Sequence, residues 1–350
     1  MYYNQLTYLL RVTNSCFLNC SYCMVKDQLT HDRINDTPSD LAPHSLVETM
    51  FDKAIGFGEV YLTFVGGEPM MAGKEWFRKT FEIMKSKAEQ RCISVSSRIY
   101  TNGLLLDDEW VEMFKENGCQ IFISWDGLGF GKKGSQKAYE IITRYAKQIT
   151  TVTPVISKAN CHAIKDIYKQ LNEAGVKRMT CQYDIYASTE QMIEFGNATC
   201  ELFRHIESEP LECKTRFLIY HDAKAMALGT GRLSSNEMSA AVLNNDYVIN
   251  PDGEIILGLP QDEDERFRLG SIYSIGHIND VLFSAKMKWL NDCYVKAQRL
   301  IGNYERTNML TRGGGFFFDK KQIQDMDKPF MAKLACYHVI LSYFLNRGAK

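Results

Sequence analysis

The sequence has no excess of either charge, because 41 Lys and Arg residues face 42 Asp and Glu residues and give a formal net charge of −1. A nucleic-acid-binding surface usually shows an excess of Lys and Arg, so we expect no nucleic-acid partner. No apolar run approaches the roughly 20 residues of a membrane helix. The N-terminus, Met1 to Gln5, also lacks the basic and apolar regions of a signal peptide. These absences predict a cytoplasmic protein with no membrane partner.

Cysteine, in contrast, is abundant, with eleven residues in a chain that shows no export signal. An odd number of cysteines outside an oxidising compartment favours reduced thiols and metal ligation over a disulfide framework. Three of them, Cys16, Cys20 and Cys23, have the spacing CxxxCxxC, and the next cysteine is Cys92. A structural zinc site needs four ligands, whereas a cubane iron–sulfur cluster held by three thiolates leaves one iron for a ligand that is not protein. The triplet alone leaves a zinc or redox site open as the alternative.

The first 210 residues alternate short β-rich runs with amphipathic helical stretches, which is typical of parallel sheets and barrels. In one predicted helix, apolar residues from Ala163 to Ala174 recur at helical spacing and Gly175 marks the C-terminal end. Asp107 or Asp108 is predicted to cap another helix. We therefore predict an α/β protein with six strands, at Thr7 to Thr13, Val60 to Val65, Ser94 to Tyr100, Gln120 to Trp125, Thr151 to Ile156 and Arg178 to Tyr183.

Three further motifs follow successive predicted strands. Gly66-Gly67-Glu68-Pro69 follows the second strand, Thr101-Asn102-Gly103 the third and Ser124-Trp125-Asp126-Gly127 the fourth. Glycine lets a backbone approach a ligand closely, and the carboxylate of Glu68 accepts hydrogen bonds from an ammonium group. One such glycine pair usually marks only a turn. Because the chemistry of α/β barrels lies at the carboxyl ends of the strands, we expect the motifs and the cysteine loop to share one site.

The string CFLNCSYC, from Cys16 to Cys23, resembles the CxxxCxΦC signature of the radical S-adenosylmethionine (radical SAM) superfamily, in which Φ is aromatic. The three later motifs resemble those of its SPASM and Twitch subgroup. The resemblance implies a partial (β/α)6 barrel in which Cys16, Cys20 and Cys23 hold one [4Fe-4S] cluster, whose free iron binds S-adenosylmethionine. It also implies a set of cofactor-binding residues, namely Tyr22, Gly66, Gly67, Glu68, Pro69, Asn102, Ser124 and Asp126.

The character of the sequence changes beyond about residue 215, with a predicted hairpin turn at Asn250-Pro251-Asp252-Gly253 and a glycine run at Gly313 to Gly315. We predict a barrel domain over residues 1–215 and a smaller α+β domain over residues 216–350. The hairpin and the segment Leu269-Gly270-Ser271-Ile272 resemble a SPASM or Twitch domain, in which about seven cysteines bind auxiliary clusters. Only Cys293 remains where that domain has a CxxC, so the resemblance implies a degenerate domain without auxiliary clusters.

The resemblance implies reductive cleavage of S-adenosylmethionine to methionine and a 5′-deoxyadenosyl radical, which abstracts hydrogen from a substrate C–H. An electron donor such as flavodoxin or ferredoxin is then required. Members of the subgroup mostly modify ribosomally made peptides by cross-linking, epimerisation or oxidation, and a peptide is our first expectation for the substrate. A radical epimerase or dehydrogenase acting on a small molecule is the alternative, and a non-catalytic iron–sulfur or zinc scaffold is the second. Candidates for an acid, a base or a hydrogen donor are Cys181, Asp184, His221 and Cys293.

Overall fold

The computed structural model describes residues 5–33, 37–131, 135–184, 186–210, 212, 214–228, 246–256, 265–288 and 328–347. The chain divides into two compact units. The first comprises residues 1–101, 105–121 and 241–291, and the second comprises residues 102–104, 122–240 and 292–350. Each of these compact units contains residues from both sides of residue 215. A compact unit is not the same as a domain of the sequence, so the predicted domain division at residue 215 stays a prediction.

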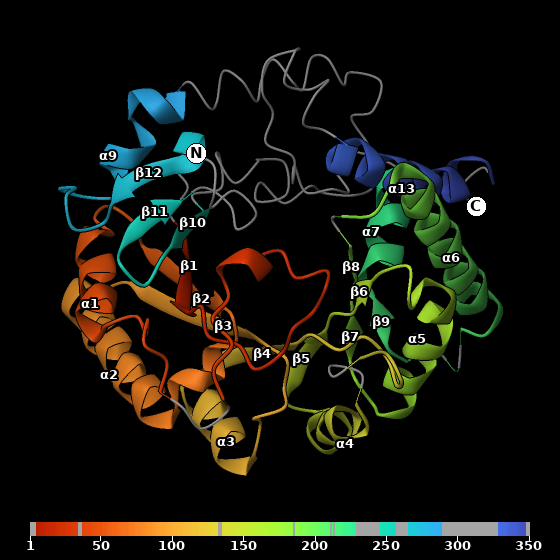
Figure 1. Ribbon diagram of the computed structural model, residues 1–350, viewed down its shortest axis with the longest axis horizontal. Helices are drawn as coiled ribbons and strands as arrows, with labels where there is room; N and C mark the ends of the chain where they lie inside the picture. The colour runs from red at the N-terminus through yellow and green to blue at the C-terminus, as the bar shows by residue number, and fades with distance from the viewer. Residues whose placement is uncertain are drawn as a thin grey trace. The chain divides into compact units, whose positions relative to one another are not determined.

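The first unit is a mixed sheet with helices packed on it (Figure 1). Its strands are β1 (Gln5–Thr13), β2 (Glu59–Gly66), β3 (Ser94–Thr101), β10 (Asp246–Ile249), β11 (Glu254–Ile256) and β12 (Arg268–Ser271). Its helices are α1 (His44–Lys53), α2 (Lys74–Arg91), α3 (Asp108–Glu116) and α9 (Asn279–Leu282), with 3-10 turns η1 (Lys26–Gln28), η2 (Pro69–Ala72) and η5 (Glu265–Phe267). The strand order is β12-β11-β10-β1-β2-β3, and β10, β1, β2 and β3 run parallel. β11 pairs antiparallel with β10 and with β12.

Apolar residues on alternate positions of β2 turn toward the helices of this unit. Leu62 and Phe64 are fully buried, and Phe64 meets the rings of Trp76 and Phe77 edge-on. At the start of α3, the side chain of Asp107 accepts a hydrogen bond from the N–H of Trp110 at 2.9 Å. This contact confirms the predicted helix cap and assigns it to Asp107.

The second unit combines short parallel strands with long helices. Its strands are β5 (Ile149–Val152), β6 (Val155–Ile156), β7 (Arg178–Met179), β8 (Gln182–Tyr183) and β9 (Arg216–Phe217). Its helices are α4 (Gln136–Tyr145), α5 (Ile164–Glu173), α6 (Thr189–Ser208), α7 (Leu218–Ala227) and α13 (Lys328–Leu345), with the 3-10 turn η3 (Cys161–Ala163). β5, β7 and β9 pair in parallel, and β6 and β8 form a separate parallel pair. Helices α6 and α13 pack side by side (Figure 1); a Cβ added at Gly196 in α6 would lie only 2.8 Å from the carbonyl of Cys336.

Strand β4 (Cys119–Ile123) begins in the first unit and ends in the second. It stops two residues before the predicted end at Trp125. The prediction of one continuous fifth strand was wrong. This segment divides into β5 and β6 at Pro154, which has no N–H to donate to a neighbouring strand. The predicted sixth strand divides likewise into β7 and β8.

The α/β class with a parallel sheet is confirmed. The predicted turn at Asn250 is confirmed as well, since the N–H of Gly253 donates to the carbonyl of Asn250 at 2.8 Å between β10 and β11. The glycine run from Gly313 to Gly315 lies outside the described residues. In the parts of the chain that are described, no helix has both the length and the apolar character needed to cross a membrane.

Candidate functional site

The cysteine loop follows β1 and is held by a returning segment around Thr30. The N–H of Cys16 donates to the carbonyl of Thr30 at 2.9 Å, and the N–H of Thr30 donates to the carbonyl of Asn14 at 3.0 Å. Nδ1 of His31 lies 3.1 Å from the carbonyl oxygen of Cys16. The backbone of Cys16 is therefore fixed on both sides, and its side chain starts from a defined position.

The three thiols of this loop lie close enough to influence one another. Cys16 is buried, while Cys20 and Cys23 are half-buried. Burial raises the pKa of the Cys16 thiol to about 12, and the N–H of Leu18, 3.4 Å from its sulfur, acts in the opposite direction. The charges of Glu68, Cys20 and Cys23 raise that pKa further. The first unit thus brings the three predicted cluster ligands and Glu68 into one site.

Asp40 anchors the start of the cysteine loop. Its Oδ1 accepts a hydrogen bond from the hydroxyl of Thr13 at 2.6 Å, and its Oδ2 accepts one from the N–H of Asn14 at 2.7 Å. The hydroxyl oxygen of Thr13 in turn accepts from the N–H of Ser15 at 3.0 Å. Asp40 carries no local signal in the sequence, because it lies 26 residues beyond Asn14.

Gly66 and Gly67 bring the end of β2 against the cysteine loop. The N–H of Gly67 donates to the carbonyl of Thr13, and the N–H of Glu68 donates to the carbonyl of Ser15, both at 2.8 Å. A Cβ added at Gly66 would lie 2.3 Å from the Thr13 carbonyl, and one at Gly67 would lie 2.2 Å from the Ser15 carbonyl. The two glycines are thus required where the chain approaches itself; their predicted contact with a ligand stays a prediction.

Glu68 is a buried carboxylate directly behind this junction, with 1% of its surface exposed. Its Oε1 accepts hydrogen bonds from the hydroxyl of Thr101 at 2.7 Å and from the N–H of Met70 at 3.1 Å. A buried carboxylate is stable only when hydrogen-bond donors or a cation replace its lost hydration. Pro69, which begins η2, is buried, and Tyr22 on the cysteine loop is half-buried.

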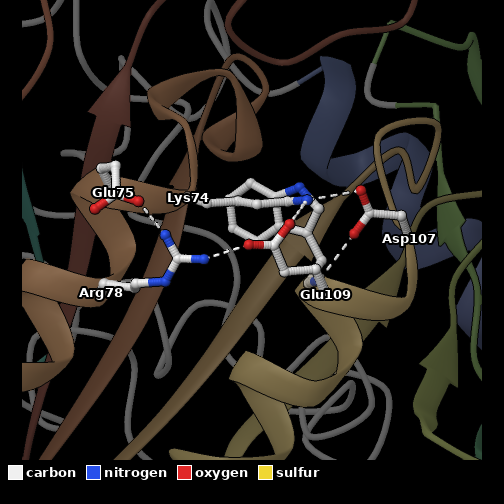
Figure 2. Close-up of polar contacts among 6 residues, drawn as sticks. Lys74, Glu75, Arg78, Asp107 and Glu109 are labelled. Atoms are coloured by element: carbon white, nitrogen blue, oxygen red, sulfur yellow. Dashed lines mark hydrogen bonds and ion pairs between the residues drawn. The ribbon is translucent and has the colours of Figure 1, made fainter.

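Ion pairs join helix α2, which follows the Glu68 loop, to helix α3. Nζ of Lys74, at the start of α2, lies 2.7 Å from Oδ2 of Asp107 and 2.5 Å from Oε2 of Glu109 at the start of α3 (Figure 2). Arg78 pairs with both Glu75 and Glu109. These ion pairs hold the start of α2 against the start of α3.

The remaining predicted cofactor residues belong to the second unit. Oδ1 of Asn102 accepts from the N–H of Leu104 at 3.0 Å. Asp126 is 2% exposed, and its Oδ1 accepts from the N–H of Val155 at 2.9 Å, where β6 begins. Ser124 is half-buried directly after β4. Asn102 and Asp126 therefore stabilise turns of their own unit, and the predicted cofactor contacts of all three stay predictions.

The four candidates for an acid, a base or a hydrogen donor differ in their surroundings. Cys181 is 5% exposed, and burial raises its thiol pKa to about 12, so this thiol keeps its hydrogen at neutral pH. Oδ1 of Asp184 accepts from the N–H of Tyr186 at 2.9 Å in a local turn. His221 lies exposed on α7, and Cys293 lies outside the described residues. No role is established for any of the four.

A single metal ion and a cluster place different demands on the three thiols. Among the described residues, no three Cys, His, Asp or Glu side chains surround one point as the ligands of one metal ion would. Cysteines that hold a cubane cluster each bind a different iron, so they need not converge on one point. Three cysteines on one backbone-anchored loop fit that requirement in number and type.

Comparison with known proteins adds independent information about this region. The family model described as the Radical SAM superfamily matches residues 10–180. The cysteine-type anaerobic sulfatase-maturating enzyme of Clostridium novyi (strain NT) is 31% identical over 172 residues, which is 45% of each chain. The match thus spans less than half the length of that relative.

Solved structures match over nearly the whole chain. Native anSMEcpe with bound AdoMet has a TM-score of 0.72 at 17% identity, and the match covers 98% of each chain. Native anSMEcpe with bound AdoMet and Cp18Cys peptide has a TM-score of 0.70 at 16% identity, covering 98% of this chain and 97% of that one. At such low identity these likenesses show the fold alone.

Proposed function

Because the chain carries a radical SAM domain over residues 10–180, we propose that it is a radical SAM enzyme that cleaves S-adenosylmethionine and modifies a residue of a peptide. The family resemblance of the motifs is confirmed over this range. One observation carries the proposal: the loop of Cys16, Cys20 and Cys23 is bonded through its backbone to the loop that carries the buried Glu68.

In this proposal the three cysteines hold one [4Fe-4S] cluster, and Glu68 receives the ammonium group of S-adenosylmethionine. When bound, the cluster supplies one electron, and S-adenosylmethionine supplies the 5′-deoxyadenosyl radical that takes hydrogen from the substrate. The protein residues orient and shield this chemistry. Asp40 and Thr30 hold the loop, while the predicted cofactor contacts of Asn102, Ser124 and Asp126 stay predictions.

The names of similar proteins and structures support a peptide substrate. The Clostridium novyi relative is a sulfatase-maturating enzyme, and one structure of similar fold holds both AdoMet and a peptide. A flavodoxin or ferredoxin is the proposed electron donor. The absence of auxiliary clusters stays a prediction, and it is tested by iron content: about four iron atoms per chain are expected for one cubane, and eight or more would contradict it.

The test of the proposed function is 5′-deoxyadenosine formation by the anaerobically reconstituted, reduced protein. Wild type should form it, and the triple variant Cys16→Ala, Cys20→Ala, Cys23→Ala should form none. The matched control is Cys92→Ala, which removes an exposed thiol outside the loop and should retain the activity. If wild type forms no 5′-deoxyadenosine, the protein is the non-catalytic scaffold instead.

The substrate class needs a separate measurement. A peptide deuterated at Cα and at the side-chain carbons should pass deuterium to 5′-deoxyadenosine and change in mass itself. Transfer from a small metabolite, with none from any peptide, would replace the peptide proposal by the small-molecule one.

A further inference from the structure

A threonine outside the predicted cofactor set holds the carboxylate of Glu68. Thr101 closes β3 and is 3% exposed, and its hydroxyl lies 2.7 Å from Oε1 of Glu68. The same hydroxyl lies 3.3 Å from the sulfur of Met70. A hydroxyl has one hydrogen to donate, and a carboxylate is a much stronger acceptor than a thioether. The Thr101 hydrogen bond therefore goes to Glu68.

Thr101 is the last residue of β3, so its hydroxyl lies at the end of a paired strand. β3 is paired in parallel with β2 up to Phe64 and Ile99, two residues before Thr101. Threonine is branched at Cβ, which restricts its side-chain rotation in a strand. The hydroxyl consequently has little freedom to follow a moving carboxylate.

Two donors of the protein meet on one oxygen of Glu68. The Thr101 hydroxyl and the N–H of Met70 both bond Oε1. A carboxylate with one oxygen held at two points cannot rotate freely about its last side-chain bond. Its orientation is then set before any ligand arrives, which lowers the cost of ordering upon binding.

We propose that Thr101 is a positioning residue, which orients the Glu68 carboxylate for the ammonium group of S-adenosylmethionine. This inference rests on the proposed function, because it takes Glu68 as the ammonium acceptor. It adds that the strength of this contact depends on a hydroxyl that does not itself touch the ammonium group. Thr101 should then matter for ligands that carry the amino group and not for ligands that lack it.

The test compares Thr101→Val, which keeps the shape and removes the hydroxyl, with Thr101→Ser, which keeps the hydroxyl. Equilibrium dialysis of the reconstituted protein measures binding of S-adenosylmethionine and of its analogue without the amino group. Thr101→Val should bind S-adenosylmethionine about tenfold more weakly, as expected for losing a hydrogen bond to a charged group, and should bind the analogue as wild type does. Thr101→Ser should retain the wild-type preference for the amino group.

Two further variants separate positioning from a general structural effect. Thr80→Val removes another buried hydroxyl of the first unit, one with no hydrogen-bond partner among the described residues, and should leave both affinities unchanged. In a Glu68→Gln background, Thr101→Val should cause no further selective loss. Equal loss of both ligands in Thr101→Val, or no loss of either, would overturn the assignment. If wild type itself fails to bind S-adenosylmethionine, the proposed function fails and the assignment fails with it.

Discussion

Replacing Gly67 by alanine tests whether the glycines serve the junction of two loops. Gly67 does not have a positive φ, so alanine causes no backbone strain there. The destabilising effect must then come from the new methyl group, which would lie 2.2 Å from the carbonyl oxygen of Ser15 and 2.8 Å from that of Asn14. Both neighbours are backbone atoms, so relief requires the loops to separate. Separation breaks the bonds from Gly67 to Thr13 and from Glu68 to Ser15.

The expected cost combines overpacking of about 1–3 kcal/mol with two hydrogen bonds of about 0.5–1.5 kcal/mol each. Gly67→Ala should therefore lower the free energy of unfolding by about 2–6 kcal/mol, measured by anaerobic urea denaturation followed by circular dichroism. Iron retention should fall as well, because the cysteine loop is one side of the junction.

Gly73→Ala is the matched control for this substitution. Gly73 has φ +81° and ψ 160° and open space around its added Cβ, so alanine there costs only backbone strain of about 1–3 kcal/mol. Gly73→Ala should keep its iron. If Gly67→Ala were no less stable than Gly73→Ala and kept its iron, the reasoning about the junction would be refuted.

Three other predictions concern single side chains. Asp40→Ala should lower stability by about 1–3 kcal/mol, because it removes a charged acceptor of two hydrogen bonds, and should reduce iron retention; unchanged iron content would contradict its anchoring role. Lys74→Met should cost no more than about 1 kcal/mol, since its partners are largely exposed, and this difference should vanish in 1 M salt; a difference that persists would show that packing rather than charge is responsible. Iodoacetamide at pH 8 should label Cys92, which is exposed, far faster than Cys181, whose burial raises its pKa to about 12; comparable rates, read by peptide mass spectrometry, would contradict that burial.

The strands were predictable where a local apolar pattern was enough to define them. β1, β2 and β3 lie within one or two residues of their predicted bounds. The interruption at Pro154 was visible in the sequence as a residue without an N–H, yet the alternating pattern on both sides suggested one strand. Strand breaks depend on where the neighbouring strand continues, and a local pattern does not contain that information.

Long-range contacts explain the rest of what the sequence left undetermined. The turn at Asn250 was predictable from its residues, but the parallel pairing of β10 with β1 joins positions more than 200 residues apart. The cysteine motif predicted a loop, while the anchor at Asp40 and the donor at Thr101 depend on side chains that meet only after folding. Motif residues, Thr101 among them, could be found one by one; the contacts that hold them in place could not.

The positions that motifs assign to cofactor binding also maintain the fold, and this decides which substitutions are informative. Backbone atoms of Thr13 and Ser15 occupy the space that a side chain at Gly66 or Gly67 would need. Loss of cofactor binding in a glycine variant would therefore not prove a contact with the cofactor. Glu68→Gln and Thr101→Val leave the backbone junction intact, because neither the bond from Gly67 to Thr13 nor that from Glu68 to Ser15 involves a side chain. The carboxylate and its hydroxyl donor are therefore the positions at which the proposed cofactor recognition can be measured without disturbing the backbone junction.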